Sequence, residues 1–160
     1  MKMFYGEAGD SKAPTILPLH GFPSSSHMFR VPTPLLADRD HVIAPDLPGF
    51  GFTEAPQRTE LKHTFENLAS VIDTFTHNIG LDRYAIYVFG YGAPVGFRLA
   101  LEHPERITSI VSQNGNAYEE GLSDGRTRCR NIGRSRPTSI MPPFTRFLRL
   151  KPPNFSVCTE

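Results

Sequence analysis

Residues 84–101 are YAIYVFGYGAPVGFRLAL, and this stretch decides the fold. Residues 85–89 form a short apolar, β-rich run before a glycine, which is typical of a buried strand. Residues 93–102 carry apolar side chains at helical spacing. The chain therefore passes from strand to helix within residues 89–93. Such a sharp turn needs small residues, because two backbones come close together there.

The turn at residues 89–93 has the form of a nucleophile elbow. In such an elbow the side chain at the apex faces solvent, and the amide that follows helps to form an oxyanion hole. The residue at the apex is Gly90, which has no side chain. The sequence therefore predicts the architecture of a hydrolytic site without its reacting group.

Length and composition indicate a globular protein with one main domain. The chain has 160 residues, 39% of them apolar and 21% charged, which is enough for a real core. No apolar run approaches the roughly 20 residues that span a bilayer, and the N-terminus lacks the apolar region of a signal peptide. The two cysteines, Cys129 and Cys158, define neither a disulfide framework nor a metal site. We therefore expect a cytoplasmic protein with no cofactor, no metal and no membrane partner.

The charge distribution divides the chain near Gly125. Residues 1–125 contain 9 Lys and Arg against 15 Asp and Glu, whereas residues 126–160 contain 8 Lys and Arg against Glu160 alone. Prolines also cluster in the second segment. We expect a domain over residues 1–125 and a basic, Pro- and Arg-rich tail without a recognisable fold over residues 126–160.

Three interpretations of the tail stay open. It is a disordered segment by its composition, a basic contact for nucleic acid or acidic membranes, or an out-of-frame translation of the region that should follow. Composition favours the first, so a nucleic-acid partner is unlikely. Translating the gene in its other two frames tests the third, because a hydrolase-like sequence should then appear.

The rest of the chain alternates strand and helix patterns. Buried strands are expected at residues 15–19, 41–44 and 107–111, a first strand at residues 2–5, and the clearest helix at residues 61–79. This alternation predicts a mostly parallel sheet with helices on both faces. The glycine loops at residues 20–22 and 90–92 should share the C-terminal edge of the sheet, where such folds bind ligands.

Three motifs carry a family resemblance: HGFP at residues 20–23, DLPGFG at residues 46–51 and VFGYGAP at residues 88–94. In this order they resemble the α/β-hydrolase fold superfamily, especially its haloalkane dehalogenase and epoxide hydrolase branch. The resemblance covers about residues 4–125, roughly the first half of such an enzyme. It implies that Gly90 occupies the nucleophile position, where this branch usually has Asp and esterase relatives have Ser. It also implies that the backbone N–H groups of Phe22 and Tyr91 form the oxyanion or leaving-group hole.

Departures from the family pattern shape the expected function. Gly90 cannot form a covalent intermediate, and the resemblance leaves the cap domain, the later strands, the catalytic acid and the C-terminal histidine unmatched. We therefore expect a truncated, inactive family member whose ancestral activity was hydrolysis of an ester, haloalkane or epoxide. One alternative is a working hydrolase with Ser24, Ser25 or Asp46 as nucleophile, although Asp46 is more plausible as a turn-capping carboxylate. Another is a non-catalytic binding protein that uses the cleft at the rim or the basic tail.

The expected strand at residues 107–111 has further strands beside it in the resembling fold, and this chain lacks them. Its outer edge would then present unpaired backbone groups, which favour pairing with another chain. We therefore expect self-association through this edge.

Limited proteolysis tests the expected division of the chain. Residues beyond about 125 should be removed first, because loosely packed termini are cut before packed helices. Mass spectrometry of the early fragments locates the cuts. Early cleavage within residues 65–79, with the tail still protected, contradicts this division.

Overall fold

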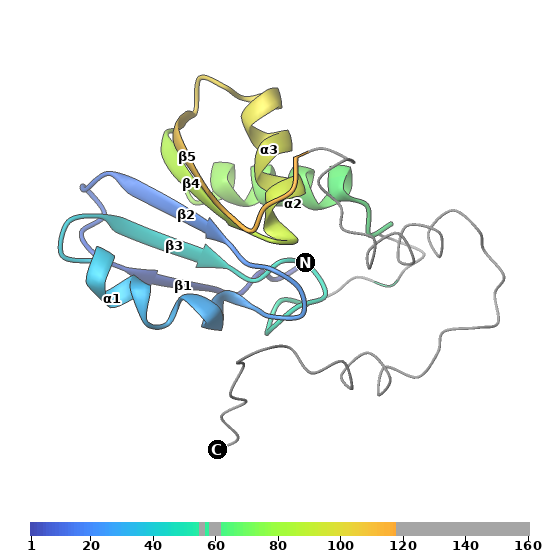
Figure 1. Cartoon of the computed structure of the whole chain (residues 1–160), viewed down its shortest axis with the longest axis horizontal. Coiled ribbons are helices and arrows are strands. Elements are labelled where there is room, and N and C mark those ends of the chain that lie inside the picture. Colours follow the sequence, from blue (N-terminus) through green and yellow to red (C-terminus); the bar gives the residue numbers. More distant parts are fainter. Residues whose placement is uncertain (55–56, 58–61, 118–160) are drawn as a thin grey trace, which may run out of the picture. The chain divides into compact units, whose positions relative to one another are not determined.

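The computed structural model describes residues 1–54, 57 and 62–117 of the chain. Five strands and their helices follow one another in the order that the sequence predicts (Figure 1). The elements are β1 (Tyr5–Ala8), β2 (Thr15–Leu19), η1 (Ser26–Phe29), α1 (Pro32–Leu36), β3 (His41–Pro45), α2 (Phe65–Asn78), β4 (Tyr84–Phe89), α3 (Gly92–Glu102) and β5 (Ile107–Gln113).

The five strands form one sheet in the order β1-β3-β2-β4-β5. β2 is parallel to β3 and β4, and β5 is parallel to β4, whereas β1 runs antiparallel to β3. Figure 1 places α1 on one side of the sheet and α2 and α3 on the other. All five residues of β3 are buried, as expected for a strand covered on both faces. The predicted mostly parallel sheet with helices on both faces is confirmed.

The first strand differs from its expected position. Residues 2–5 were expected to form it and residues 6–10 to turn, but β1 spans Tyr5–Ala8 and pairs Tyr5 with Pro45 and Ala8 with Val42. β1 alternates exposed and half-buried residues and contains Gly6, so its own hydrophobic pattern is weak. The position of β1 is set by its pairing with β3, and the local sequence of residues 2–8 does not predict that pairing.

Helix α2 begins four residues later than expected, at Phe65 instead of residue 61. Its N-cap is Thr64, whose backbone is extended and whose side-chain Oγ1 accepts the Asn67 N–H at 3.3 Å. Leu61 itself lies outside the described residues. The cap therefore sets the start of this helix, which ends at Asn78, one residue before the expected end.

The core lies between the sheet and helices α2 and α3. Helix α2 buries Leu68, Ile72 and Phe75, and α3 contributes Val95 and Leu99. Each such side chain contributes roughly 1.5–3 kcal/mol by leaving water. The described part of the chain contains no helix long and apolar enough to cross a bilayer.

Arg106 fastens α2 to the start of β5. Its guanidinium donates to Asp73 Oδ1 at 2.6 Å, to Thr76 Oγ1 at 3.0 Å and to the Leu81 carbonyl at 2.6 Å. The Arg106 side chain is only 11% exposed, so water competes poorly with these bonds. A loss of this side chain would leave three acceptors on α2 and its following loop without their donor.

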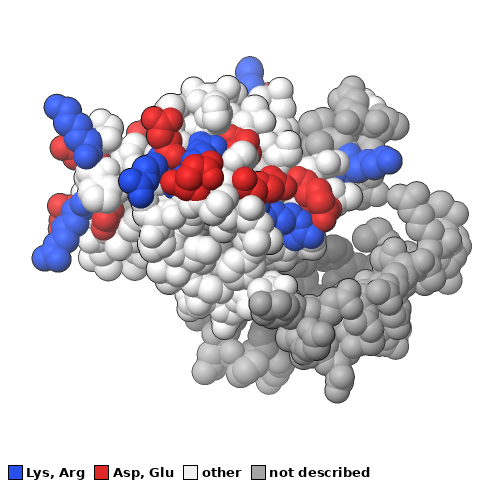
Figure 2. All heavy atoms as spheres, turned by 90° about the horizontal axis from the view of Figure 1, so that it is seen from above, with Lys and Arg blue, Asp and Glu red and all other residues white. Residues whose placement is uncertain are grey.

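A second arginine pair lies on the surface. Arg98 donates to Glu66 at 2.7 Å, with side chains 34% and 65% exposed. Figure 2 shows acidic and basic side chains interspersed over one face of the described molecule. Pairs of this kind are screened by water and salt and contribute little to stability.

The two arginines form a matched stability test. We expect Arg106→Ala to lower the free energy of unfolding by about 2–3 kcal/mol, because it removes a donor from partly buried acceptors. Arg98→Ala should lower it by less than about 1 kcal/mol. Urea unfolding followed by circular dichroism measures both changes. Equal losses in the free energy of unfolding would contradict a stabilising role of Arg106 between α2 and β5.

Candidate active site

The turn between β4 and α3 forms the predicted elbow. β4 ends at Phe89, α3 begins at Gly92, and Gly90 between them has φ of 49°. A Cβ atom on Gly92 would lie 2.3 Å from the carbonyl oxygen of Leu19, so only glycine fits at that position. This close approach lets α3 begin directly against the end of β2.

Gly90 differs from Gly92 because packing does not require it. A Cβ atom on Gly90 would have Gly21 Cα, at 3.8 Å, as its nearest neighbour, which is ordinary van der Waals contact. A side chain at position 90 would therefore be accommodated, at the cost of roughly 1–2 kcal/mol for a left-handed backbone. The apex of the elbow is open, and it carries no reacting group.

The loop that follows β2 lies against the elbow. A Cβ atom on Gly21 would approach the Phe89 ring to 2.7 Å, so the loop and the end of β4 are in contact. The rings of Phe22 and Tyr91 have centroids 6.3 Å apart. The structure thus brings together the two segments that carry the predicted hole. That the Phe22 and Tyr91 N–H groups converge on one oxygen stays a prediction.

His20 connects two loops of the rim. It is fully buried, its Nε2 accepts the Leu47 N–H at 3.0 Å, and its Nδ1 lies 3.1 Å from the Gly21 carbonyl. Since the Leu47 N–H can only donate, we assign the ring proton to Nδ1, which donates to Gly21. Burial lowers the pKa of His20, although the Gly21 carbonyl and the Asp46 carboxylate act in the opposite direction. Both ring nitrogens of His20 therefore hold backbone groups of the two loops.

Asp46 holds the loop after β3 in place. Its Oδ1 accepts the Ser26 N–H at 2.6 Å, and its Oδ2 accepts the Phe52 N–H at 2.8 Å. A Cβ atom on Gly51, whose φ is 54°, would lie 1.9 Å from Oδ2, so the loop wraps tightly around the carboxylate. The expected role as a turn-capping carboxylate is confirmed. Neither carboxylate oxygen has the freedom of a nucleophile.

A model of the alpha/beta hydrolase fold family matches residues 14–128, which contain the elbow and both loops of the rim. The chain belongs to this family. Its N-terminal motifs therefore mark the hydrolase fold, as predicted.

Several relatives of the chain are hydrolases. An uncharacterized hydrolase of Saccharomyces cerevisiae is 57% identical over 124 residues, which are 78% of this chain and 42% of that protein. Among solved structures, a haloalkane dehalogenase of Bradyrhizobium elkani gives a TM-score of 0.67 at 32% identity, over 71% of this chain and 38% of its own. An epoxide hydrolase of Vigna radiata gives 0.64 at 32%, over 69% of this chain and 34% of its own. The chain spans about two fifths of the length of the curated relatives it matches.

The two serines weighed as alternative nucleophiles serve the local backbone. Ser25 Oγ accepts the His27 N–H at 3.3 Å and caps η1. Ser24 Oγ donates to the carbonyl of Ser25 at 3.3 Å. A serine nucleophile needs a base within hydrogen-bond reach of its hydroxyl. In these contacts the partner of each serine hydroxyl is a backbone group and not a base.

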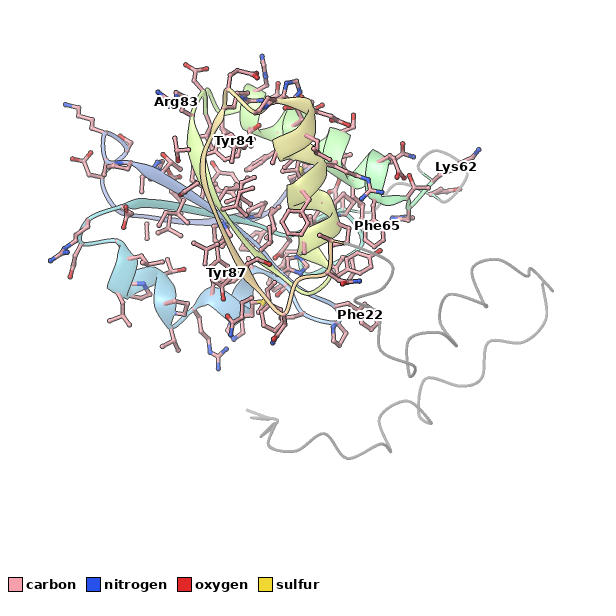
Figure 3. All side chains as sticks on the ribbon, turned by 45° about the horizontal axis from the view of Figure 1, so that its top comes forward. Phe22, Lys62, Phe65, Arg83, Tyr84 and Tyr87 are labelled. Carbon is pink, nitrogen blue, oxygen red and sulfur yellow. The ribbon has the colours of Figure 1, made fainter. Side chains whose placement is uncertain are left out.

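Aromatic rings surround the elbow of this hydrolase fold. The ring centroid of Tyr91 lies 4.8 Å from that of Phe65 and 5.7 Å from that of Phe50. The ring centroids of Phe50 and Phe22 lie 6.2 Å apart. Figure 3 shows Phe22 and Phe65 toward one end of the sheet, with Arg83 and Tyr84 at the opposite end of β4. Burial raises the pKa of the Tyr91 hydroxyl. Spacing along the sequence does not predict this group of rings, because they come from four separate segments.

A hollow of about 280 Å³ lies beneath the loop of Asp46 and not at the elbow. Ser25, Ser26 and Asp46 contribute to its lining, whereas Gly90 and Tyr91 do not. The hollow borders the loops of the rim, and the alternative of a non-catalytic binding protein that uses the cleft at the rim stays a prediction. Within the described ranges, no cluster of His, Cys, Asp and Glu side chains is placed to hold a metal ion.

His103 lies at the far end of α3 from Gly90. It caps the C-terminus of that helix, where its Nε2 is 3.5 Å from Asp73 Oδ2 and its Nδ1 is 3.7 Å from Glu105 Oε1. Eleven helical residues separate the elbow from this cap, a length of about 16 Å. His103 therefore belongs to the structural cluster around Asp73 and not to the rim.

Two glycines with similar backbone angles test the geometry of the site. Gly90→Ala should lower the free energy of unfolding by about 1–2 kcal/mol, since only left-handed strain is added. Gly51→Ala adds the same strain and also drives a methyl group into Asp46, so we expect a clearly larger loss or failure to fold. Urea unfolding compares the two variants. A loss for Gly90→Ala that equals that for Gly51→Ala would show that the apex is not open.

Proposed function

We propose that this chain is a member of the alpha/beta hydrolase fold family that does not catalyse hydrolysis in its present form. The observation that carries the proposal is Gly90 at the apex of an otherwise complete elbow. Haloalkane dehalogenases and epoxide hydrolases among its relatives point to an ancestral small-molecule substrate, a haloalkane, an epoxide or an ester. Hydrolysis by nucleophilic catalysis requires a side chain that forms the covalent intermediate, and Gly90 has none.

The retained backbone supports part of the chemistry. The N–H groups of Phe22 and Tyr91 are placed on two adjoining segments, where they would stabilise negative charge on a substrate oxygen or leaving group. This stabilisation lowers a barrier only when a bond to the reacting carbon forms at the same time. With the nucleophile absent, the site would stabilise a negatively charged group of a bound molecule but would not hydrolyse that molecule.

Other side chains near the elbow do not replace the nucleophile. Asp46 accepts two backbone N–H groups, and the Ser24 and Ser25 hydroxyls bond the local backbone. Within the described residues neither His20 nor His103 is placed as a base, because His20 Nε2 is occupied by the Leu47 N–H and His103 lies at the far end of α3. A nucleophile at position 90 would therefore form at most the first covalent bond.

Substitution at the apex tests this proposal. In Gly90→Asp, carboxylate attack on a haloalkane would form an ester with release of halide, and we expect at most one adduct per chain because no base activates water to cleave it. Gly90→Ser should give no turnover on esters, because serine needs a base even to attack. Gly90→Asn is the matched control, since it has the same size and no carboxylate.

Intact-mass spectrometry detects the adduct, and steady-state assays on haloalkanes, epoxides and esters detect turnover. The unsubstituted chain and Gly90→Asn should show neither. Turnover by the unsubstituted chain would overturn the proposed inactivity. Sustained turnover by Gly90→Asp or Gly90→Ser that is lost on adding His20→Ala would show that His20 acts as a base after all.

A further inference from the structure

The end of β5 is followed by Asn114 and Gly115, the only Asn-Gly pair in the chain. A Cβ atom on Gly115 would lie 2.5 Å from Ser112 Oγ and 2.8 Å from Ala93 Cβ, in the first turn of α3. The Ala93 methyl group has no rotamer by which it could move away, so position 115 is suited to glycine. The packing of this segment against α3 thus favours a glycine directly after an asparagine.

This order of residues has a chemical consequence. The backbone nitrogen that follows an asparagine can attack the carbon of the asparagine side-chain amide and close a five-membered succinimide ring. A side chain on the following residue hinders the attack, and glycine has none. Asparagine is therefore one of the thermolabile residues of proteins, and it is most labile before glycine.

The reacting groups at Asn114 and Gly115 are not held by other contacts. Asn114 is exposed and Gly115 is half-buried. Within residues 1–54, 57 and 62–117, no hydrogen bond engages the Asn114 side chain or the Gly115 N–H. A hydrogen bond at either group would have to break before the ring closes, and that cost is absent here.

The backbone of Asn114 is also strained. Its φ is 50°, the only positive value at a described residue other than glycine. Asparagine tolerates this left-handed region better than most residues, but the conformation still costs free energy. Because that strain is relieved when the residue leaves its native conformation, a local opening at Asn114 requires less free energy than one at an unstrained position.

We propose that Asn114 is a deamidation site of the folded protein. The Gly115 nitrogen loses its proton to water and bonds to Asn114 Cγ, and the bond from Cγ to the side-chain nitrogen breaks with release of ammonia. Water then opens the succinimide at either of its carbonyl groups. The products are aspartate and isoaspartate. The net reaction converts an amide and water to an acid and ammonia, without oxidation or reduction.

The two products affect the elbow differently. Aspartate adds a negative charge, whereas isoaspartate also lengthens the backbone before Gly115 by one carbon atom. Gly115 has little room to shift toward α3, and the adjacent Gln113 accepts the Gly90 N–H at 3.3 Å through its carbonyl. Isoaspartate therefore displaces Gly115 from α3 and weakens the bond between Gln113 and the apex of the elbow.

This modification is independent of the proposed catalytic inactivity. The reaction uses only Asn114, Gly115 and water, and it needs no residue of the elbow or of the loop at residues 20–22. A nucleophile restored at position 90 would leave the Asn-Gly pair unchanged. The two proposals therefore fail or survive separately.

Incubation of the full chain in mildly alkaline buffer, followed by peptide mass spectrometry, measures the conversion. We expect residue 114 to gain the mass of an amide-to-acid change. Asn116, which precedes Ala117 in the same segment, is the internal control and should convert much more slowly, because the alanine methyl group hinders ring closure. Asn114→Gln should abolish the conversion at position 114, since glutamine would have to close a six-membered ring. Asn116→Gln is the matched variant and should leave the conversion at Asn114 unchanged.

Amide hydrogen exchange at Gly90 tests the effect on the elbow. The isoaspartate form, separated from fresh protein by chromatography, should exchange the Gly90 N–H faster, because the bond to Gln113 is weakened. Asn114→Asp carries the negative charge without the extra backbone atom. That variant should exchange like fresh protein.

Different results would overturn the two parts of the proposal. Conversion at Asn114 only after urea has unfolded the chain would show that the folded protein protects this residue. Equal rates at Asn114 and Asn116 would show that Gly115 gives no advantage. Unchanged exchange at Gly90 in the isoaspartate form, or the same increase in Asn114→Asp, would overturn the effect on the elbow.

Discussion

The close approach of α3 to β2 is the constraint on which the rest of the structure depends. The Leu19 carbonyl would lie 2.3 Å from any Cβ atom on Gly92, so the helix can start where it does only if position 92 is glycine. This contact places the N-terminus of α3 directly after β4 and beside the loop that follows β2. The elbow at Gly90 and the loop of residues 20–22 therefore meet at the rim because of backbone packing, and no catalytic side chain is needed to bring them together.

The polar groups of the rim are used to hold its loops. His20 joins the loop after β2 to the loop after β3, and Asp46 ties residues on both sides of it through two backbone N–H groups. A side chain with both hydrogen-bonding atoms occupied in this way is a poor base or nucleophile, since reaction would break contacts that keep the site assembled. The same bonds that preserve the architecture thus leave it without spare reactive groups.

Sequence reasoning recovered the parts of the fold that local pattern encodes. The parallel strands, the stripe on α2, the elbow and the capping role of Asp46 follow from apolar spacing and from glycine and proline placement. The start of α2 and the position of β1 did not, because a cap at Thr64 and pairing with β3 decided them. The partners of the Asp46 carboxylate and the cluster of Phe22, Phe50, Phe65 and Tyr91 depend on distant segments meeting, which spacing along the chain does not encode.

The elbow keeps its left-handed apex although the residue there has no side chain to present. Gly90 lies between the end of β4 and the tightly packed Gly92, and its φ is 49°. For any other L-residue this conformation costs roughly 1–2 kcal/mol. An elbow with a nucleophilic side chain at its apex carries this strain. Glycine removes that strain. A glycine at the apex is therefore favourable for stability, and the contact at Gly92 holds the surrounding backbone whether or not position 90 carries a side chain.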